Sequence, residues 1–337
     1  MLQNTDEGFF DPEHSVTYSI NKHKYERISI MKHEFYYPSK DGLTQIHAIE
    51  WIPETEVRGI LQIAHGMVEF IDRYDHFANF MASQGFYVVG NDHLGHGKSI
   101  TDESQLGYFA KHDGNFCVLG DLQQLREDTQ KKYPDVPYFF LGHSMGSFYA
   151  RQFVEKFGEG LSGAIIMGTG YQPMATLDMG IALTAVLKKS KGDHYRSAMV
   201  NNTALGSYNK SFEPARTKND WLTKDDAIVD AYEANPLNQF MFTVNGYYNM
   251  FRGMRYAQRK ENLNKIPKDL PLLVVSGQND PVGEFGKGPK IVAETYRETG
   301  IQDVTLKLFP DDRHEILNEL DKEVVYQYLL EWIETRM

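Results

Sequence analysis

Residues 138–150 read Tyr-Phe-Phe-Leu-Gly-His-Ser-Met-Gly-Ser-Phe-Tyr-Ala, an apolar run that leads directly into Gly142-His143-Ser144-Met145-Gly146. The apolar run predicts a buried strand, and the apolar spacing of residues 147–157 predicts a helix. A turn this tight between strand and helix requires nearly side-chain-free residues two positions before and after the serine, which explains the two glycines. Ser144 is therefore expected on a strained apex with an exposed hydroxyl, the geometry of a nucleophile elbow.

A serine hydroxyl is a weak nucleophile near neutral pH, so an imidazole must accept its proton and a carboxylate must orient that imidazole. In a sheet with this elbow the chain order is serine, acid, histidine. His314 is the one histidine after residue 194, and it follows a predicted strand at 304–309. Because ligands of open parallel sheets bind at the carboxyl ends of the strands, His314 is the candidate base.

The candidate acid is Asp280, which follows a predicted strand at 270–276. The alternative interpretation is that the Asp280-Pro281 pair only initiates a turn. Asp311 and Asp312 also follow the serine, but they lie so near His314 in sequence that reaching its ring would require an unusual loop. Chain order and position at a strand end favour Asp280.

Acyl transfer also needs two N–H donors for the oxyanion. The helix after Ser144 presents the backbone N–H of Met145, and the loop after the predicted strand 59–66 presents that of Met67, with Gly66 allowing the turn. His65 is interpreted as a residue that organises this loop. The tract Asp92-His93-Leu94-Gly95-His96-Gly97-Lys98-Ser99 lacks a third clustered ligand, so it predicts a structural loop and no metal site.

Apolar strands and helical patterns alternate over residues 33–170 and 266–337, which predicts a parallel α/β sheet with helices on both faces. Residues 171–265 interrupt this pattern and predict an inserted lid, while residues 1–32 predict an N-terminal arm. The lid is rich in methionine and aromatic residues, which suit an adaptable apolar pocket, although each of them alone is equally consistent with the lid's own core. The residues expected to contact a substrate are Gly66, His143, Met241, Phe242 and Tyr247.

Composition excludes several function classes. The 337 residues carry a net charge of −11, which argues against a nucleic-acid partner. The sequence shows no signal peptide, no apolar run long enough to span a membrane, and one cysteine, Cys117, so we expect a soluble cytoplasmic protein without internal disulfides. No cofactor is expected, and the oligomeric state stays open.

Four blocks in order, residues 65–74, 92–99, 142–146 and 277–280 with 314–315, resemble the α/β-hydrolase superfamily, and within it the group of monoglyceride lipases, lysophospholipases and serine aminopeptidase-like enzymes. The resemblance runs from about residue 33 to the end. It implies a mostly parallel eight-stranded sheet with helices on both faces and an inserted, mainly helical lid that binds an acyl chain. It also implies Ser144, Asp280 and His314 as the catalytic triad, with Met67 and Met145 as oxyanion donors.

These observations predict a serine carboxylester hydrolase that forms an acyl-serine intermediate on monoacylglycerol, lysophospholipid or similar single-chain esters. Its partner is then a small ester or lipid, and the lid is a candidate for transient contact with a membrane surface. An aminopeptidase or amidase is the alternative, with Glu69 or Glu284 holding the substrate amine. A catalytically silent fold used for binding is a third hypothesis, disfavoured because all three triad residues are present.

Overall fold

The computed structural model describes residues 30–337, and within them eight strands form one sheet in the order β1-β2-β4-β3-β5-β6-β7-β8. β1 pairs antiparallel with β2 and β2 with β4, whereas all the other pairs are parallel. The predicted mostly parallel, eight-stranded sheet is confirmed. The strand bounds are β1 (Met31–Pro38), β2 (Gln45–Ile52), β3 (Gly59–Ala64), β4 (Phe86–Asn91), β5 (Tyr138–His143), β6 (Gly163–Met167), β7 (Leu272–Gly277) and β8 (Val304–Phe309).

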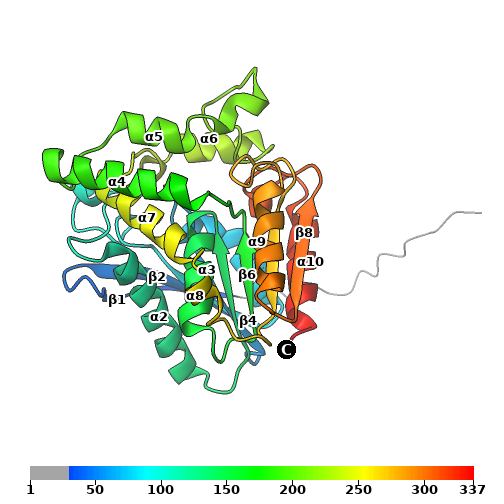
Figure 1. Ribbon diagram of the computed structural model, residues 1–337. Coiled ribbons are helices and arrows are strands. Elements are labelled where there is room, and N and C mark those ends of the chain that lie inside the picture. Colours follow the sequence, from blue (N-terminus) through cyan, green and yellow to red (C-terminus); the bar gives the residue numbers. More distant parts are fainter. Residues whose placement is uncertain (1–29) are drawn as a thin grey trace, which may run out of the picture.

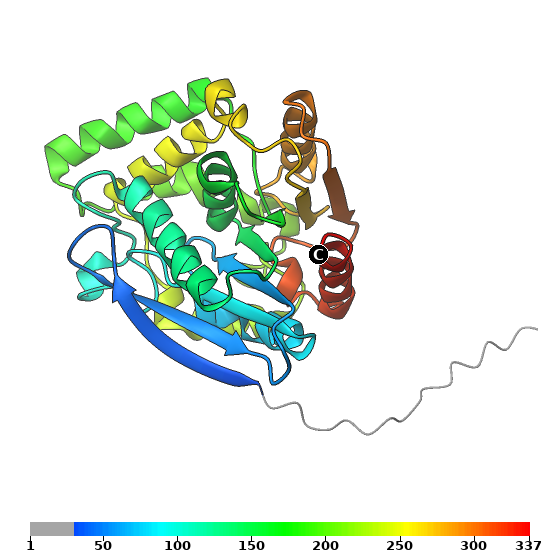
Figure 2. The same ribbon diagram turned by 90° about the horizontal axis from the view of Figure 1, so that it is seen from below.

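Helices cover both faces of the sheet (Figures 1 and 2). Successive strand side chains point to opposite faces, so in β3 Ile60 and Ala64 enter one apolar core while Leu61 and Ile63 enter the other. The first core is completed by α2, α3 and α9, and the second by α1 and α10. The bounds of these helices are α1 (Asp75–Ser83), α2 (Gly114–Lys132), α3 (Met145–Phe157), α9 (Lys287–Glu298) and α10 (Lys322–Glu334).

Between β6 and β7 the chain leaves the sheet, and we call residues 171–265 the insertion. Figure 1 shows α4, α5, α6 and α7 gathered beyond one end of the sheet, where α4 packs along α7. The bounds of the insertion's helices are α4 (Met174–Lys191), α5 (Ala198–Leu205), α6 (Asp226–Ala234), α7 (Val244–Tyr256) and α8 (Lys260–Leu263). Short 3₁₀ turns complete the chain: η1 (Ile71–Tyr74), η2 (Glu103–Gln105), η3 (Tyr208–Phe212), η4 (Pro236–Asn238) and η5 (Ile316–Asn318).

The predicted last helix, residues 316–334, is interrupted. η5 ends at Asn318, and α10 begins at Lys322. Between them Glu319 is fully buried, and its carboxylate accepts the backbone N–H groups of Arg313 at 2.7 Å and Lys224 at 3.1 Å. Because this side chain is turned back toward the loop before it, the backbone at Glu319 is extended and the helix has to start again.

The predicted N-terminal arm, residues 1–32, falls almost wholly outside the described residues, although Met31 and Lys32 belong to β1. In residues 30–337, no helix combines the length and the apolar character that crossing a membrane requires.

Candidate active site

The strand-to-helix turn after β5 puts Ser144 in a conformation that non-glycine residues rarely adopt, with φ of 54° and ψ of −118°. The two flanking glycines have no room for a side chain. A Cβ atom on Gly142 would lie 2.1 Å from the carbonyl oxygen of Gly146, and one on Gly146 would lie 2.0 Å from that of Ala64. Close packing of α3 against β3 and β5 therefore creates the apex that the sequence predicted.

Asp280 and His314 meet at the carboxyl ends of β7 and β8. Nδ1 of His314 lies 2.9 Å from Oδ2 of Asp280, but the N–H bond of Nδ1 does not point along the line that joins the two atoms. Both side chains are buried, and Asp280 also accepts hydrogen bonds from the Ser276 hydroxyl at 3.1 Å and from the Val282 N–H at 2.8 Å. The carboxylate is thereby fixed beside the imidazole.

Asp312, one of the alternative acids, does not take this position. Asp312 is paired with Lys224 of the insertion, its Oδ1 atom 3.2 Å from the ammonium nitrogen. The ring centroids of His143 and Trp221 lie 4.7 and 5.0 Å from that of the His314 imidazole. Two aromatic rings and one carboxylate are thus the immediate neighbours of the His314 imidazole.

The loop after β3 passes directly beside the elbow. A Cβ atom on Gly66 would lie 2.5 Å from Oε1 of Glu69 and 3.0 Å from Cβ of Ser144, so this close approach leaves no room for a side chain. No hydrogen bond among residues 30–337 uses the backbone N–H of Met67 or Met145. Both residues line the cavity above Ser144.

The histidines of the two neighbouring loops organise the backbone, as the sequence predicted. Nδ1 of His65 bonds to the Gly66 carbonyl oxygen at 2.7 Å, and its Nε2 accepts the His93 N–H at 2.9 Å. Burial lowers the pKa of both histidines and lowers that of His96 to about 3, so all three stay neutral. In residues 30–337, no three His, Cys, Asp or Glu side chains cluster in a way that would hold a metal ion.

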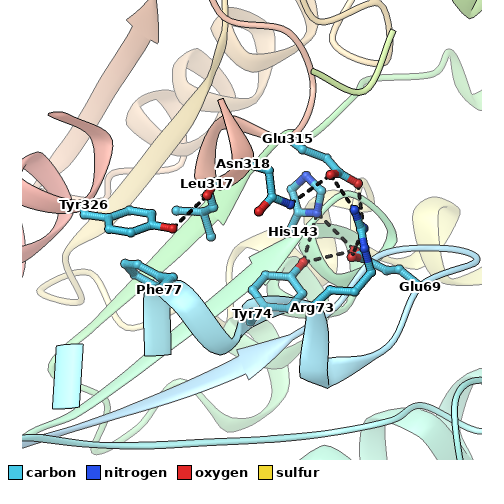
Figure 3. Close-up of a pocket in the computed structure, with 9 residues that line it drawn as sticks. All are labelled: Glu69, Arg73, Tyr74, Phe77, His143, Glu315, Leu317, Asn318 and Tyr326. Atoms are coloured by element: carbon cyan, nitrogen blue, oxygen red, sulfur yellow. Dashed lines mark hydrogen bonds and ion pairs between the residues drawn. The ribbon is translucent and has the colours of Figure 1, made fainter. Parts of the chain in front are cut away.

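A buried cluster of charges surrounds His143, the residue before Ser144 (Figure 3). Arg73 donates to Glu69 at 2.9 Å and, through both terminal nitrogens, to Glu315 at 2.7 and 2.8 Å. Nδ1 of His143 lies 3.0 Å from the Tyr74 hydroxyl and 3.2 Å from Oε1 of Glu69. The same Oε1 atom accepts the N–H of Gly66, so the cluster reaches the loop that carries Met67.

Electrostatics keeps this cluster charged despite its burial. Burial by itself favours the neutral carboxyl groups, but His143 and Arg73 lower the pKa of Glu69, and Arg73 lowers that of Glu315. Burial likewise opposes the cationic forms, yet the two carboxylates raise the pKa of Arg73, and Glu69 raises that of His143. The sequence interpretation gave Arg73 and Glu315 no role. Only the i, i+4 spacing of Glu69 and Arg73 hinted at their ion pair.

Above the elbow lies a cavity of about 730 Å³. Core residues at the carboxyl ends of the strands form its floor, including Met67, His143, Ser144, Met145 and His314. The insertion forms much of the remaining wall. The apolar side chains that the insertion contributes include Leu177, Met179, Leu183, Val200, Leu205, Phe240, Met241, Met250, Phe251 and Met254.

Of the residues expected to contact a substrate, His143 and Met241 line this cavity, whereas Gly66, Phe242 and Tyr247 are not among its lining residues. Phe242 and Tyr247 are fully buried and pack against each other with ring centroids 5.6 Å apart. Phe242 also contacts the rings of Phe109 and His96. These two aromatic residues therefore belong to the apolar core that the insertion shares with the rest of the fold.

Comparison with known proteins identifies the family. Residues 55–321 match the family described as serine aminopeptidase, S33. The chain belongs to this family. It is 26% identical to a monoacylglycerol lipase of Mycolicibacterium smegmatis over 317 residues, which cover 91% of this chain and 98% of that protein. It is 25% identical to the mouse monoglyceride lipase, covering 85% of this chain and 86% of that protein.

Solved structures agree with this assignment. A crystal structure of a thermostable carboxyl esterase from Bacillus coagulans in complex with glycerol has a TM-score of 0.85 and 30% identity to this chain, covering 91% of this chain and 99% of that one. A soluble variant of the monoglyceride lipase of Saccharomyces cerevisiae shares the fold, with a TM-score of 0.71 at 19% identity, covering 94% of this chain and 98% of that one. This member of the S33 family is thus an α/β-hydrolase of the group that contains lipases and esterases.

Proposed function

We propose that this chain is a serine carboxylester hydrolase in which Ser144 attacks the ester carbonyl and forms an acyl-serine intermediate. The observation that carries the proposal is the strained Ser144 at the floor of a large apolar cavity that His314, paired with Asp280, also lines. The cavity volume of about 730 Å³ falls within the range of about 300–1,000 Å³ that is usual for small-molecule sites.

The chemistry follows from these groups. His314 accepts the proton of Ser144 as its oxygen bonds to the carbonyl carbon, and the N–H groups of Met67 and Met145 stabilise the oxyanion. The tetrahedral intermediate expels the alcohol, which takes the proton from His314. Water, deprotonated by the same imidazole, then hydrolyses the acyl-serine and restores the enzyme. Asp280 holds the imidazole and stabilises its charged form.

We propose single-chain esters such as monoacylglycerols or lysophospholipids as the substrates. Methionine and aromatic side chains of the insertion supply an adaptable apolar wall for one acyl chain. The monoacylglycerol lipase and carboxyl esterase among the relatives support this substrate class. In this proposal the insertion, residues 171–265, is the lid of the site.

An aminopeptidase or amidase would need a carboxylate that is free to bind the substrate amine. Among the described residues that line the cavity, the acidic ones are Glu69 and Glu315, and both are bound to Arg73. Glu284 lies outside this lining and pairs with Lys287 at 3.0 Å. These contacts favour an ester substrate.

The proposal is tested with p-nitrophenyl esters of increasing acyl length and with fluorophosphonate labelling. Wild type should hydrolyse the esters and take up the label, whereas Ser144→Ala should lose about 10⁶-fold in kcat and all labelling. Ser83→Ala, which removes another partly buried hydroxyl, is the matched control and should behave as wild type. Absence of ester turnover together with absence of labelling in wild type would refute the proposal, and faster cleavage of aminoacyl anilides would favour the peptidase.

We also propose that the lid touches a lipid surface. Met179, Leu183 and Val186 follow one face of α4 at i, i+4 and i+7 spacing, and these residues are 66%, 39% and 64% exposed. Met179 and Leu183 also line the cavity, and the last turn of α4 carries the exposed Lys189 and Lys191, whose charges suit an anionic surface. Co-sedimentation with vesicles of anionic lipid should weaken in a Met179→Glu/Val186→Glu variant, and undiminished binding would contradict this proposal.

A further inference from the structure

Two side chains of the insertion bind the same backbone oxygen in the loop after β3. The hydroxyl of Tyr232, in α6, donates to the Val68 carbonyl oxygen at 3.0 Å, and the amide of Asn238, in η4, donates to it at 2.7 Å. Tyr232, Asn238 and Val68 are all buried. A single carbonyl thus receives two donors from a part of the chain that follows it by more than 160 residues.

The bonded residue is conformationally strained. Val68 has a φ of 58°, which is unusual for a β-branched residue and persists only where surrounding contacts impose it. Upstream, the N–H of Gly66 is bound by Oε1 of Glu69. The segment that carries the Met67 N–H is therefore held at both ends, by Glu69 at Gly66 and by the insertion at Val68.

We propose that Tyr232 and Asn238 are positioning residues for the oxyanion site, because their two hydrogen bonds hold the loop so that the Met67 N–H faces the carbonyl above Ser144. This inference rests on the proposed ester hydrolysis. Neither side chain has to touch the reacting atoms. Displacement of the insertion from the core breaks both hydrogen bonds at once, so the oxyanion site is complete only while the insertion stays packed against the core.

The test compares Tyr232→Phe, Asn238→Leu and the double variant with wild type in steady-state hydrolysis of a p-nitrophenyl ester. Tyr232→Phe keeps the ring over which the Arg73 guanidinium lies, 4.9 Å from the centroid, and removes only the hydroxyl. Tyr37→Phe is the matched control, since Tyr37 is also buried and donates to a backbone carbonyl, that of Asp121, at 3.0 Å in another part of the molecule.

Each single variant should lose roughly 3- to 10-fold in kcat, and the double variant should approach the loss of about 100-fold that follows removal of one oxyanion donor, with KM changed less than about 2-fold. A structural defect alone would lower the melting temperature without lowering kcat selectively over KM. Tyr37→Phe should show only such a lower melting temperature. If both single variants keep the kcat of Tyr37→Phe while wild type is active, the positioning role is refuted and the hydrolase proposal stands. A wild type without turnover or labelling overturns both.

Discussion

Replacement of Arg73 by methionine tests whether the buried charge cluster contributes to stability as its contacts indicate. Arg73 makes three hydrogen bonds to Glu69 and Glu315, and only 11% of its side chain is exposed. Methionine fills much of the same space without the charge, so Glu315 loses the cation that it binds and Glu69 keeps only His143, 3.2 Å away, as a cationic neighbour. Breaking a buried ion pair from one side typically costs about 3–5 kcal/mol, and we expect a loss of that size at pH 8.

The loss should shrink as the pH falls. In wild type the pKa values of Glu69 and Glu315 are lowered, so their contribution is fully present above the unfolded value of about 4.3 and is lost only as the pH falls toward the lower folded values. In the variant, burial without Arg73 should raise the pKa of at least one carboxyl above that of the unfolded chain. The variant then gains stability between pH 8 and 5 by binding a proton. In wild type both carboxylates stay ionised over this range, so they do not change its free energy of unfolding.

Urea unfolding followed by circular dichroism at pH 8 and pH 5 measures the effect. The destabilisation by Arg73→Met should be smaller at pH 5 by at least about 1.4 kcal/mol, equivalent to one pKa unit on one carboxyl. Arg126→Met is the matched control, because Arg126 is buried and donates to the Phe157 and Glu159 carbonyls, and no ion pair of residues 30–337 includes it. Equal destabilisation by Arg73→Met at both pH values would refute the electrostatic explanation.

Further predictions concern the elbow and the cavity wall. Gly146→Ala puts a Cβ atom 2.0 Å from the Ala64 carbonyl oxygen, so it should cost at least about 1–3 kcal/mol and abolish fluorophosphonate labelling; a melting temperature equal to that of wild type would contradict this. Phe242→Ala should lower the free energy of unfolding by about 3–5 kcal/mol because removal of the ring leaves a cavity in the core. Met241→Ala should instead alter the preference for acyl length, which the p-nitrophenyl ester panel measures, and an unchanged preference would remove Met241 from the binding wall.

The sequence predicted the elements whose local pattern is strong. The buried strand, elbow and helix at 138–157 are present because glycine spacing and apolar periodicity are local signals, and the parallel sheet follows from the alternation of strands and helices. The break before α10 was not predicted. Glu319 reads as an ordinary helical residue until its carboxylate is seen to bind two backbone N–H groups, one of them from the insertion.

The same division applies to the site. Strand ends and chain order constrain where a serine, an acid and a histidine of this kind can lie, so the sequence names Ser144, Asp280 and His314 as candidates, and the structure brings Asp280 and His314 within 2.9 Å of each other. The sequence did not distinguish Met241, which lines the cavity, from Phe242, which is buried, because both lie in the same methionine- and aromatic-rich region.

The sequence by itself determined the type of sheet, the elbow and the candidate catalytic groups, since each depends on residue types at fixed short spacings or on their order along the chain. Only the tertiary structure decided how the loop after β3 is held. The contacts of Arg73 with Glu315 and of Tyr232 and Asn238 with Val68 join residues more than 160 positions apart. Packing of the insertion and the last loop against the core creates these contacts, and no local pattern encodes them.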